Sequence, residues 1–241
     1  MSLIKTRGIV LKLLPYNDKS RIVKIYTDQF GLRNFIVSAG SGKTARQKNA
    51  LLQPLQPLLL EASFAESSKL TRLGEISTAG SVFNALQHHT KRSLMMFINE
   101  VLYKSLKEEL SDIPLFEFLL ASIAYIEEAP ANFANFHLIF LIELSQYLGF
   151  RPVNNYSALS NHFYLQDGCF GPFHAEKLMM NEDLSALFSQ LMQTDYGQMH
   201  TIPLTAAWRN KLTEMILKYY ACHLSAFREI KSLEILAEVH S

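Results

Sequence analysis

Aromatic and basic side chains are interleaved along residues 12–35 of the sequence. This combination binds single-stranded nucleic acid, because bases stack on aromatic rings while phosphates pair with cations. Strand alternation would place Phe35 on the same face as Arg33, so Phe35 is the candidate for stacking on a base. The alternative is that Phe35 lies in a core, where the aromatic residues of small barrels are more often found. The predicted contacts in this segment are Lys12, Lys19, Arg21, Lys24, Arg33 and Phe35.

A second basic segment follows at residues 40–48. Residues 41–44 read Ser-Gly-Lys-Thr, the ending of a phosphate-binding P-loop, but Val37 stands where that motif needs its first glycine. A nucleotide-hydrolysing loop is therefore not supported. The segment instead favours a flexible basic loop whose cations contact phosphates without reading sequence. The cations concerned are Lys43, Arg46 and Lys48.

The charge of the chain is divided unequally along its length. Residues 1–80 hold twelve Lys and Arg against five Asp and Glu, a balance of +7, whereas the remainder carries −6. The total of +1 conceals this difference. A basic block on a short β-patterned segment is the electrostatic footprint of a nucleic-acid-binding protein. The alternative from charge alone is a solvated basic face.

Catalytic and metal-binding chemistry finds little support in the sequence. His162, Cys169 and His174 could be metal ligands, but their spacing matches no familiar zinc site and a fourth ligand is missing nearby. No arrangement of nucleophile, base and acid stands out elsewhere. We therefore predict a protein without catalytic residues, metal or cofactor.

The compartment is predicted from what the sequence contains and lacks. Two cysteines in 241 residues fit a reducing environment. The N-terminal residues lack the apolar stretch of a signal peptide, and no run approaches the length of a membrane span. These observations predict a cytoplasmic protein with no membrane partner.

The elements that must position these side chains change in period near residue 80. Five short β-patterned runs precede that point, at 9–14, 21–27, 32–38, 58–64 and 69–77. Five short antiparallel strands suit a small closed barrel, of which the OB-fold is the commonest and an SH3-like barrel the rival. Helical periodicity then runs through 82–89, 91–110, 114–128, 134–148, 183–192, 205–227 and 230–237.

These periods predict an α+β protein with an N-terminal OB-fold β-barrel and an all-α C-terminal domain. The expected boundaries are 1–80 for the DNA-binding barrel and 81–241 for the helical domain, with an irregular insert at about 151–175. The helix at 136–148 is apolar nearly all round, so it should be the central, buried one.

Several motifs, taken in order, resemble those of the bacterial recombination mediator RecO family. Residues 6–11 read Thr-x-Gly-Ile-Val-Leu, 17–23 read Asn-Asp-x-Ser-x-Ile-Val, and 27–32 read Thr-x-x-x-Gly-Leu. Residues 148–152 read Leu-Gly-Phe-x-Pro, and 220–223 read Tyr-x-x-His. The resemblance extends over nearly the whole chain and implies an OB-fold followed by a helical domain.

The chain departs from that family at the insert. Many members carry four zinc-binding cysteines after the Leu-Gly-aromatic-x-Pro stretch, whereas residues 153–175 hold only Cys169. Zinc is therefore not expected here. The insert should instead be held by its aromatic residues, Tyr156, Phe163, Tyr164, Phe170 and Phe173.

The resemblance implies a non-enzymatic DNA repair and recombination mediator. Such a protein binds single- and double-stranded DNA, anneals complementary strands, contacts the C-terminal tail of the single-strand-binding protein SSB, and acts with RecR to load RecA at gaps. For the tail we predict a site on the late helices, where Lys211, Met215 and Lys218 share one helical face; the alternative is that these lysines only solvate it. A rival function is a non-catalytic adaptor whose barrel binds a protein.

Overall fold

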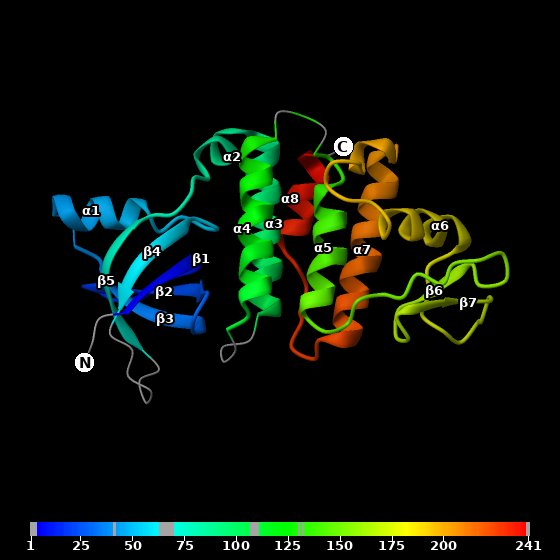
Figure 1. The fold of residues 1–241 in the computed structure, drawn as a ribbon, viewed down its shortest axis with the longest axis horizontal. Helices are drawn as coiled ribbons and strands as arrows, with labels where there is room; N and C mark the ends of the chain where they lie inside the picture. Colours follow the sequence, from blue (N-terminus) through cyan, green and yellow to red (C-terminus); the bar gives the residue numbers. More distant parts are fainter. Residues whose placement is uncertain are drawn as a thin grey trace. The chain divides into compact units, whose positions relative to one another are not determined.

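The computed structural model describes residues 4–40, 42–62, 70–106, 111–129, 131 and 133–239. The chain forms two compact units, residues 1–128 and 129–241, which are described separately. The first unit contains the barrel and, after its last strand, three helices. The second unit is mostly helical (Figure 1). No helix among the described residues is long and apolar enough to cross a membrane.

Five strands close into a barrel at the N-terminus. They are β1 (Ile4–Asn17), β2 (Ser20–Thr27), β3 (Gly31–Ser38), β4 (Pro57–Ala62) and β5 (Thr71–Thr78). The order is β1-β2-β3-β5-β4, with β1 antiparallel to both β2 and β4, and a short parallel pairing of β3 with β5 closing the barrel. This is the OB-fold arrangement, so the predicted fold is confirmed. The end of the strand predicted at 58–64 and the start of that at 69–77 lie outside the described residues.

Alternation of apolar residues along the strands fills the barrel. Val10, Val23, Ile25, Leu58 and Leu60 are buried in one cluster inside it. The turn between β2 and β3 depends on a glycine, because Gly31 has φ +64°, a conformation that L side chains rarely adopt. Local sequence signals thus account for both the register and the turn of this hairpin.

A helix, α1 (Lys43–Ala50), lies between β3 and β4 where a flexible basic loop was predicted, so that prediction is wrong. Lys43, Arg46 and Gln47 lie on its exposed side, whereas Ala45 and Lys48 are partly buried. This spacing of three and four residues is helical, but the segment is too polar for an apolar pattern to reveal it.

Three helices complete the first unit: α2 (Phe83–Gln87), α3 (His89–Ser105) and α4 (Ile113–Glu128). The barrel is joined to α4 by an ion-pair network in which Arg7 meets Asp28 at 2.9 Å and Glu117 at 2.6 Å. Tyr26 of β2 also packs against Phe116, with ring centroids 6.2 Å apart. Because these helices attach to the barrel, the compact unit ends at Glu128, although the change from strand to helix falls after Thr78.

The second unit contains the helices α5 (Phe136–Tyr147), α6 (Glu182–Leu191), α7 (Ala206–His223) and α8 (Ser232–Val239), the 3-10 turn η1 (Met199–Thr201), and a hairpin of β6 (His162–Tyr164) and β7 (Cys169–Gly171). Nine of the twelve residues of α5 are buried, which confirms the prediction of a central buried helix. The neighbouring α7 is fastened to α5 by a hydrogen bond of 2.6 Å from the Tyr220 hydroxyl to the Leu141 carbonyl.

The insert folds around aromatic residues and one amide. Phe163 and Phe170 are buried with ring centroids 5.0 Å apart, and Phe163 also meets Phe188 at 4.7 Å. The Asn155 side chain both donates to the Phe170 carbonyl at 3.0 Å and accepts from the Phe170 amide at 2.8 Å. Of the five aromatics predicted to hold the insert, Phe163, Tyr164 and Phe170 are buried, whereas Tyr156 and Phe173 are exposed.

The donor set of the insert does not fit a structural zinc ion. His162 is buried with its Nδ1 2.8 Å from Asn161 Oδ1 and its ring against Phe173. Cys169 is half-buried and His174 is exposed, and no group of three His, Cys, Asp or Glu among the described residues is placed to hold a metal. A closed zinc site needs four ligands.

We predict that the stability of the insert depends on Asn155 and not on a metal. Chelator should leave the melting temperature of the full-length protein unchanged, whereas Asn155→Ala should lower the free energy of unfolding by about 2 kcal/mol, because two backbone groups of Phe170 lose their partner. Gln166→Ala, at an exposed amide of the same insert, is the matched control. One zinc ion per chain in elemental analysis would contradict this prediction.

Candidate nucleic-acid interface

Two lysines of the barrel face each other beside an aromatic ring of α3. Lys12 of β1 and Lys24 of β2 are direct partners in the antiparallel ladder. Like charges at such positions repel one another. The Tyr103 ring lies beneath both, with its centroid 4.3 Å from Lys12 Nζ and 5.3 Å from Lys24 Nζ. The negative face of the ring stabilises cations held there, so a concentrated positive charge is maintained on this surface.

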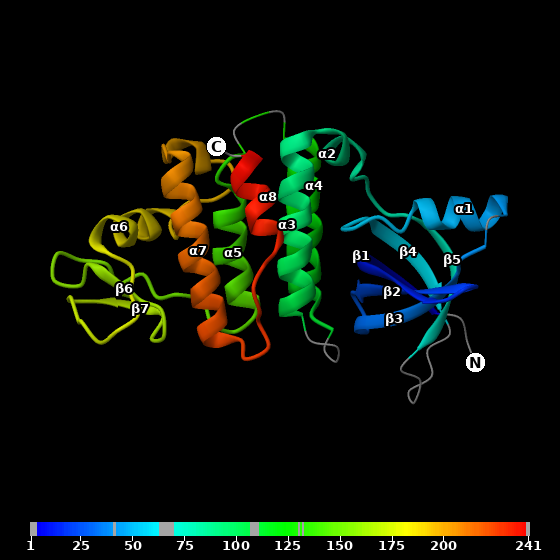
Figure 2. The same cartoon turned by 180° about the vertical axis from the view of Figure 1, so that it is seen from behind.

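A groove with a volume of about 530 Å³ opens beside this pair. Its barrel side includes Lys12 and Arg21, and its α3 side includes Glu100, Tyr103 and Lys104. Glu100 is the single acid among the described residues of the lining, and it is paired with Lys104 at 2.8 Å. Figures 1 and 2 both show α3 beside the barrel within this unit. The groove therefore combines several cations with an aromatic ring.

Two other predicted cations lie on different parts of the barrel. Lys19 is exposed in the β1–β2 turn, where its backbone amide donates to Asn17 Oδ1 at 3.0 Å. Arg33 is half-buried, and its Nε donates to the Phe30 carbonyl at 2.9 Å. Arg33 pairs with Ile25 near the opposite end of the β2–β3 ladder from Arg21, so it is not part of the groove.

Phe35 cannot stack on a base, and its prediction as a contact is wrong. Its side chain is 0% exposed and belongs to the core cluster inside the barrel. The alternation that placed it with Arg33 is correct, but that face points inward, where Phe35 and Val37 are buried and Arg33 is half-buried. Tyr16, 54% exposed near the β1–β2 turn, is an aromatic side chain that a ligand can reach.

The three cations of α1 have different roles. Lys43 and Arg46 are exposed, so both can contact phosphate. Lys48 instead donates its ammonium protons to the backbone carbonyls of Leu73, at 2.7 Å, and Gly74. Burial, together with the charge of Arg72, lowers the pKa of Lys48 below its ordinary value. Lys48 therefore fastens α1 to β5, which removes it from the candidate contacts.

We predict that Lys48→Ala destabilises the protein by about 1 kcal/mol, because the two carbonyls lose a charged donor. Lys43→Ala is the matched control on the same helix and should change the free energy of unfolding by less than about 0.5 kcal/mol. Chemical denaturation monitored by circular dichroism measures both values. Equal stability of the two variants would show that the contacts of Lys48 do not hold α1 in place.

The three residues predicted to bind a protein tail differ in exposure and in their partners. Met215 is buried and does not line the groove that lies beside α7, so that part of the prediction is wrong. Lys211 is exposed but paired with Glu214 at 3.2 Å. Lys218 is exposed and lies at the edge of a second groove.

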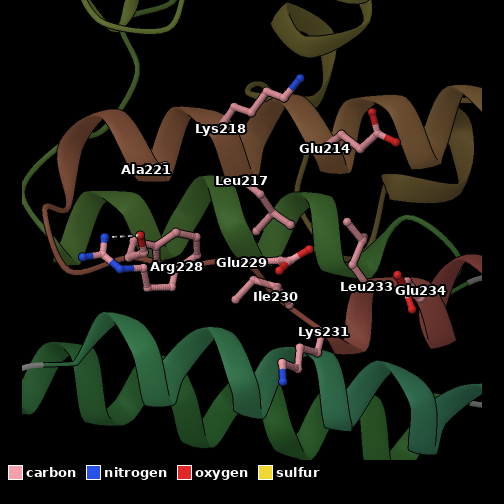
Figure 3. Close-up of a pocket in the computed structure, with 11 residues that line it drawn as sticks. Glu214, Leu217, Lys218, Ala221, Arg228, Glu229, Ile230, Lys231, Leu233 and Glu234 are labelled. Atoms are coloured by element: carbon pink, nitrogen blue, oxygen red, sulfur yellow. Dashed lines mark hydrogen bonds between the residues drawn. The ribbon is translucent and has the colours of Figure 1, made fainter.

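This second groove, of about 600 Å³, runs between one face of α7 and the segment 227–234. Its apolar part includes Leu217, Ile230 and Leu233, which Figure 3 shows around one hollow. Charged residues of both signs surround it: Glu214, Lys218, Arg228, Glu229, Lys231 and Glu234. Leu217, two residues after Met215 and therefore on a different side of α7, is the apolar residue that lines the groove.

Tyr103 and Lys104 are site residues that were not predicted from the sequence. They lie on α3, more than 75 positions after the strands that they accompany, and α3 contacts β1 only in the folded unit. Their pattern along the helix is that of an ordinary amphipathic helix. No local signal in the sequence indicates that this face adjoins the barrel.

Comparisons with known proteins cover both units of the chain. The family model described as "Recombination protein O N terminal" matches residues 1–82, and "Recombination protein O C terminal" matches residues 86–234. The DNA repair protein RecO of Phocaeicola vulgatus is 36% identical over 98% of this chain and 99% of its own length. That of Flavobacterium psychrophilum is 35% identical over 99% of both chains, and that of Bacteroides fragilis is 33% identical over 98% of both.

Proposed function

The chain belongs to the recombination protein O family of DNA repair proteins, and on this premise we propose that it is a non-enzymatic mediator which binds DNA through its barrel. The observation that carries this proposal is the groove beside Tyr103, where Lys12, Arg21 and Lys24 gather on one side of the barrel. Its cations suit phosphate, which every DNA sequence presents alike.

We propose that this surface binds single and double strands and promotes annealing of complementary strands. Two strands repel one another through their phosphates, and cations on a protein surface reduce that repulsion. Lys43 and Arg46, on the exposed side of α1, are two further cations of the same unit. Annealing by this route needs charge neutralisation and no catalytic group, in agreement with the proposed non-enzymatic role.

Salt dependence of DNA binding tests the proposal. Purified full-length protein is titrated with labelled single-stranded and duplex oligonucleotides at two salt concentrations, and anisotropy is recorded. Binding through several phosphates should weaken steeply as salt rises, for both DNA forms. Binding that is absent, or independent of salt, would overturn the proposal and favour an adaptor whose barrel binds a protein.

For its protein partners we propose the C-terminal tail of SSB and RecR, with which the chain would load RecA at gaps. The tail requires cations beside an apolar hollow, because it ends in acids and a hydrophobe. The second groove supplies Leu217, Ile230 and Leu233, with Lys218 at its edge (Figure 3). Lys211 lies one helical turn before Glu214, which lines the same groove, and is paired with that acid at 3.2 Å.

We predict that Lys211→Glu with Lys218→Glu weakens binding of an SSB-tail peptide about tenfold, because two attractive charges become repulsive. Isothermal titration of the peptide against the wild-type protein and this double variant measures the effect. DNA binding serves as the internal control, since neither lysine lies in the first unit. Equal peptide affinity in both proteins would place the tail site elsewhere.

A further inference from the structure

The groove between the barrel and α3 contains more than phosphate binding requires. Beyond its cations it is lined by three amide side chains, Asn49, Gln53 and Asn99, and by the apolar residues Leu13, Leu52 and Pro54. Phosphate oxygens accept hydrogen bonds, and apolar side chains offer them no donor. A nucleobase has apolar faces and a polar edge, which is the combination that this lining provides.

One atom in the wall indicates a ligand with a hydrogen-bond donor. Asn99 Oδ1 is buried and has no hydrogen-bond partner among the described residues. An unsatisfied buried acceptor is costly, so its retention in a groove wall needs an explanation. Asn99 lines the groove and the last torsion of asparagine is broad, so a rotation about it can present this oxygen to a ligand held there. An ionised phosphate cannot satisfy this oxygen, whereas the N–H groups of a base edge can.

The size of the groove and its rim agree with this assignment. Its volume of about 530 Å³ is within the range of small-molecule pockets, about 300–1,000 Å³, so one nucleotide can enter. Lys12 and Arg21 lie on the barrel side of the same groove, within reach of the phosphate of that nucleotide. Tyr103 already holds Lys12 and Lys24 over its ring, so it acts on the phosphate through these lysines.

We propose that this groove holds one unpaired nucleotide of a DNA single strand, with its phosphate at Lys12 and Arg21 and its base edge at the Asn99 amide. The inference rests on the proposed DNA binding and adds to it a means of distinguishing single strands from duplex. A base paired within a duplex is stacked and cannot enter a groove of this kind, whereas an unpaired base can.

The test compares a deoxycytidine oligomer with an abasic strand of equal length, both labelled, by anisotropy at one salt concentration. The full-length wild-type protein should bind the deoxycytidine strand more tightly, since only that strand offers base N–H donors. Asn99→Leu should lower affinity for the deoxycytidine strand about fivefold, the equivalent of one neutral hydrogen bond, and leave the abasic strand unchanged. Asn84→Leu on exposed α2 is the matched control.

Tyr103→Leu provides a second measurement, and its expected pattern would not arise if Tyr103 had only a structural role. It should weaken both strands equally and make the salt dependence shallower, while Tyr103→Phe, which keeps the ring, restores both properties. Equal affinity of the wild-type protein for the two strands would overturn the nucleotide proposal, even if Asn99→Leu failed to fold, and would leave phosphate binding intact. Failure to bind either strand would overturn the proposed function as well.

Discussion

Replacing Lys12 and Lys24 together by methionine is expected to weaken binding of all DNA sequences about 10- to 30-fold at about 0.1 M salt. The two lysines are cross-strand partners held over one ring, so they concentrate two positive charges beside the groove. Their removal takes two cations from the phosphate-binding surface. Methionine keeps the apolar length of the side chain, so the packing against Tyr103 is retained.

The salt dependence of binding identifies the reason for any loss. If both lysines contact phosphate, a plot of log affinity against log salt should become shallower by about 1.8, because each contact releases its share of counterion. A double variant in the second unit, Lys211→Met with Lys218→Met, removes the same number of charges from outside the barrel's own unit and should keep the wild-type slope. An unchanged slope in the Lys12 and Lys24 variant would show that the groove does not contact phosphate.

Glu127→Gln is expected to destabilise the protein by about 2 kcal/mol. The Glu127 carboxylate is buried and accepts hydrogen bonds from the amides of Asn84 and Ala85, at 3.0 and 2.8 Å, and from the Ser81 hydroxyl. These amides belong to the first turn of α2, where a negative charge also complements the helix dipole. A neutral amide offers one acceptor oxygen in place of two and no charge.

The adjacent residue provides the control for this prediction. Glu128 follows Glu127 on α4 and is exposed, so Glu128→Gln should change the free energy of unfolding by less than about 0.5 kcal/mol. Urea denaturation of the two variants beside the wild-type protein measures the difference. An equal loss of stability in both variants would show that the effect comes from the change in net charge and not from the cap of α2.

The effect of Glu127 should also depend on pH. Burial by itself would raise its pKa, but the hydrogen bonds from Ala85, Asn84 and Ser81, with the charge of Lys91, lower the pKa below its ordinary value. A group whose pKa is lowered on folding stabilises the protein above its unfolded pKa, and that stabilisation is lost as the pH falls through the folded value. The difference between the wild-type protein and Glu127→Gln should therefore narrow in acid and be full at neutral pH.

Local sequence patterns determined the secondary structure of most of this protein. Alternation of apolar residues identified the barrel strands, and spacings of three and four identified α3, α4, α5 and α7, because each period is set by the geometry of its own backbone. The OB-fold and the buried position of α5 follow from the same patterns. The unequal division of charge likewise indicated which part of the chain carries the basic surface.

Only the tertiary structure decided which individual side chains can act. Phe35 and Lys48 have the right types for DNA contacts, but barrel closure buries the ring, and the packing of α1 on β5 engages the ammonium group. Tyr103 joins Lys12 because α3 contacts β1, a pairing between residues 91 positions apart. A sequence period shows which side chains share a face. It does not show what covers that face, because burial and long-range contact depend on how separate elements pack together.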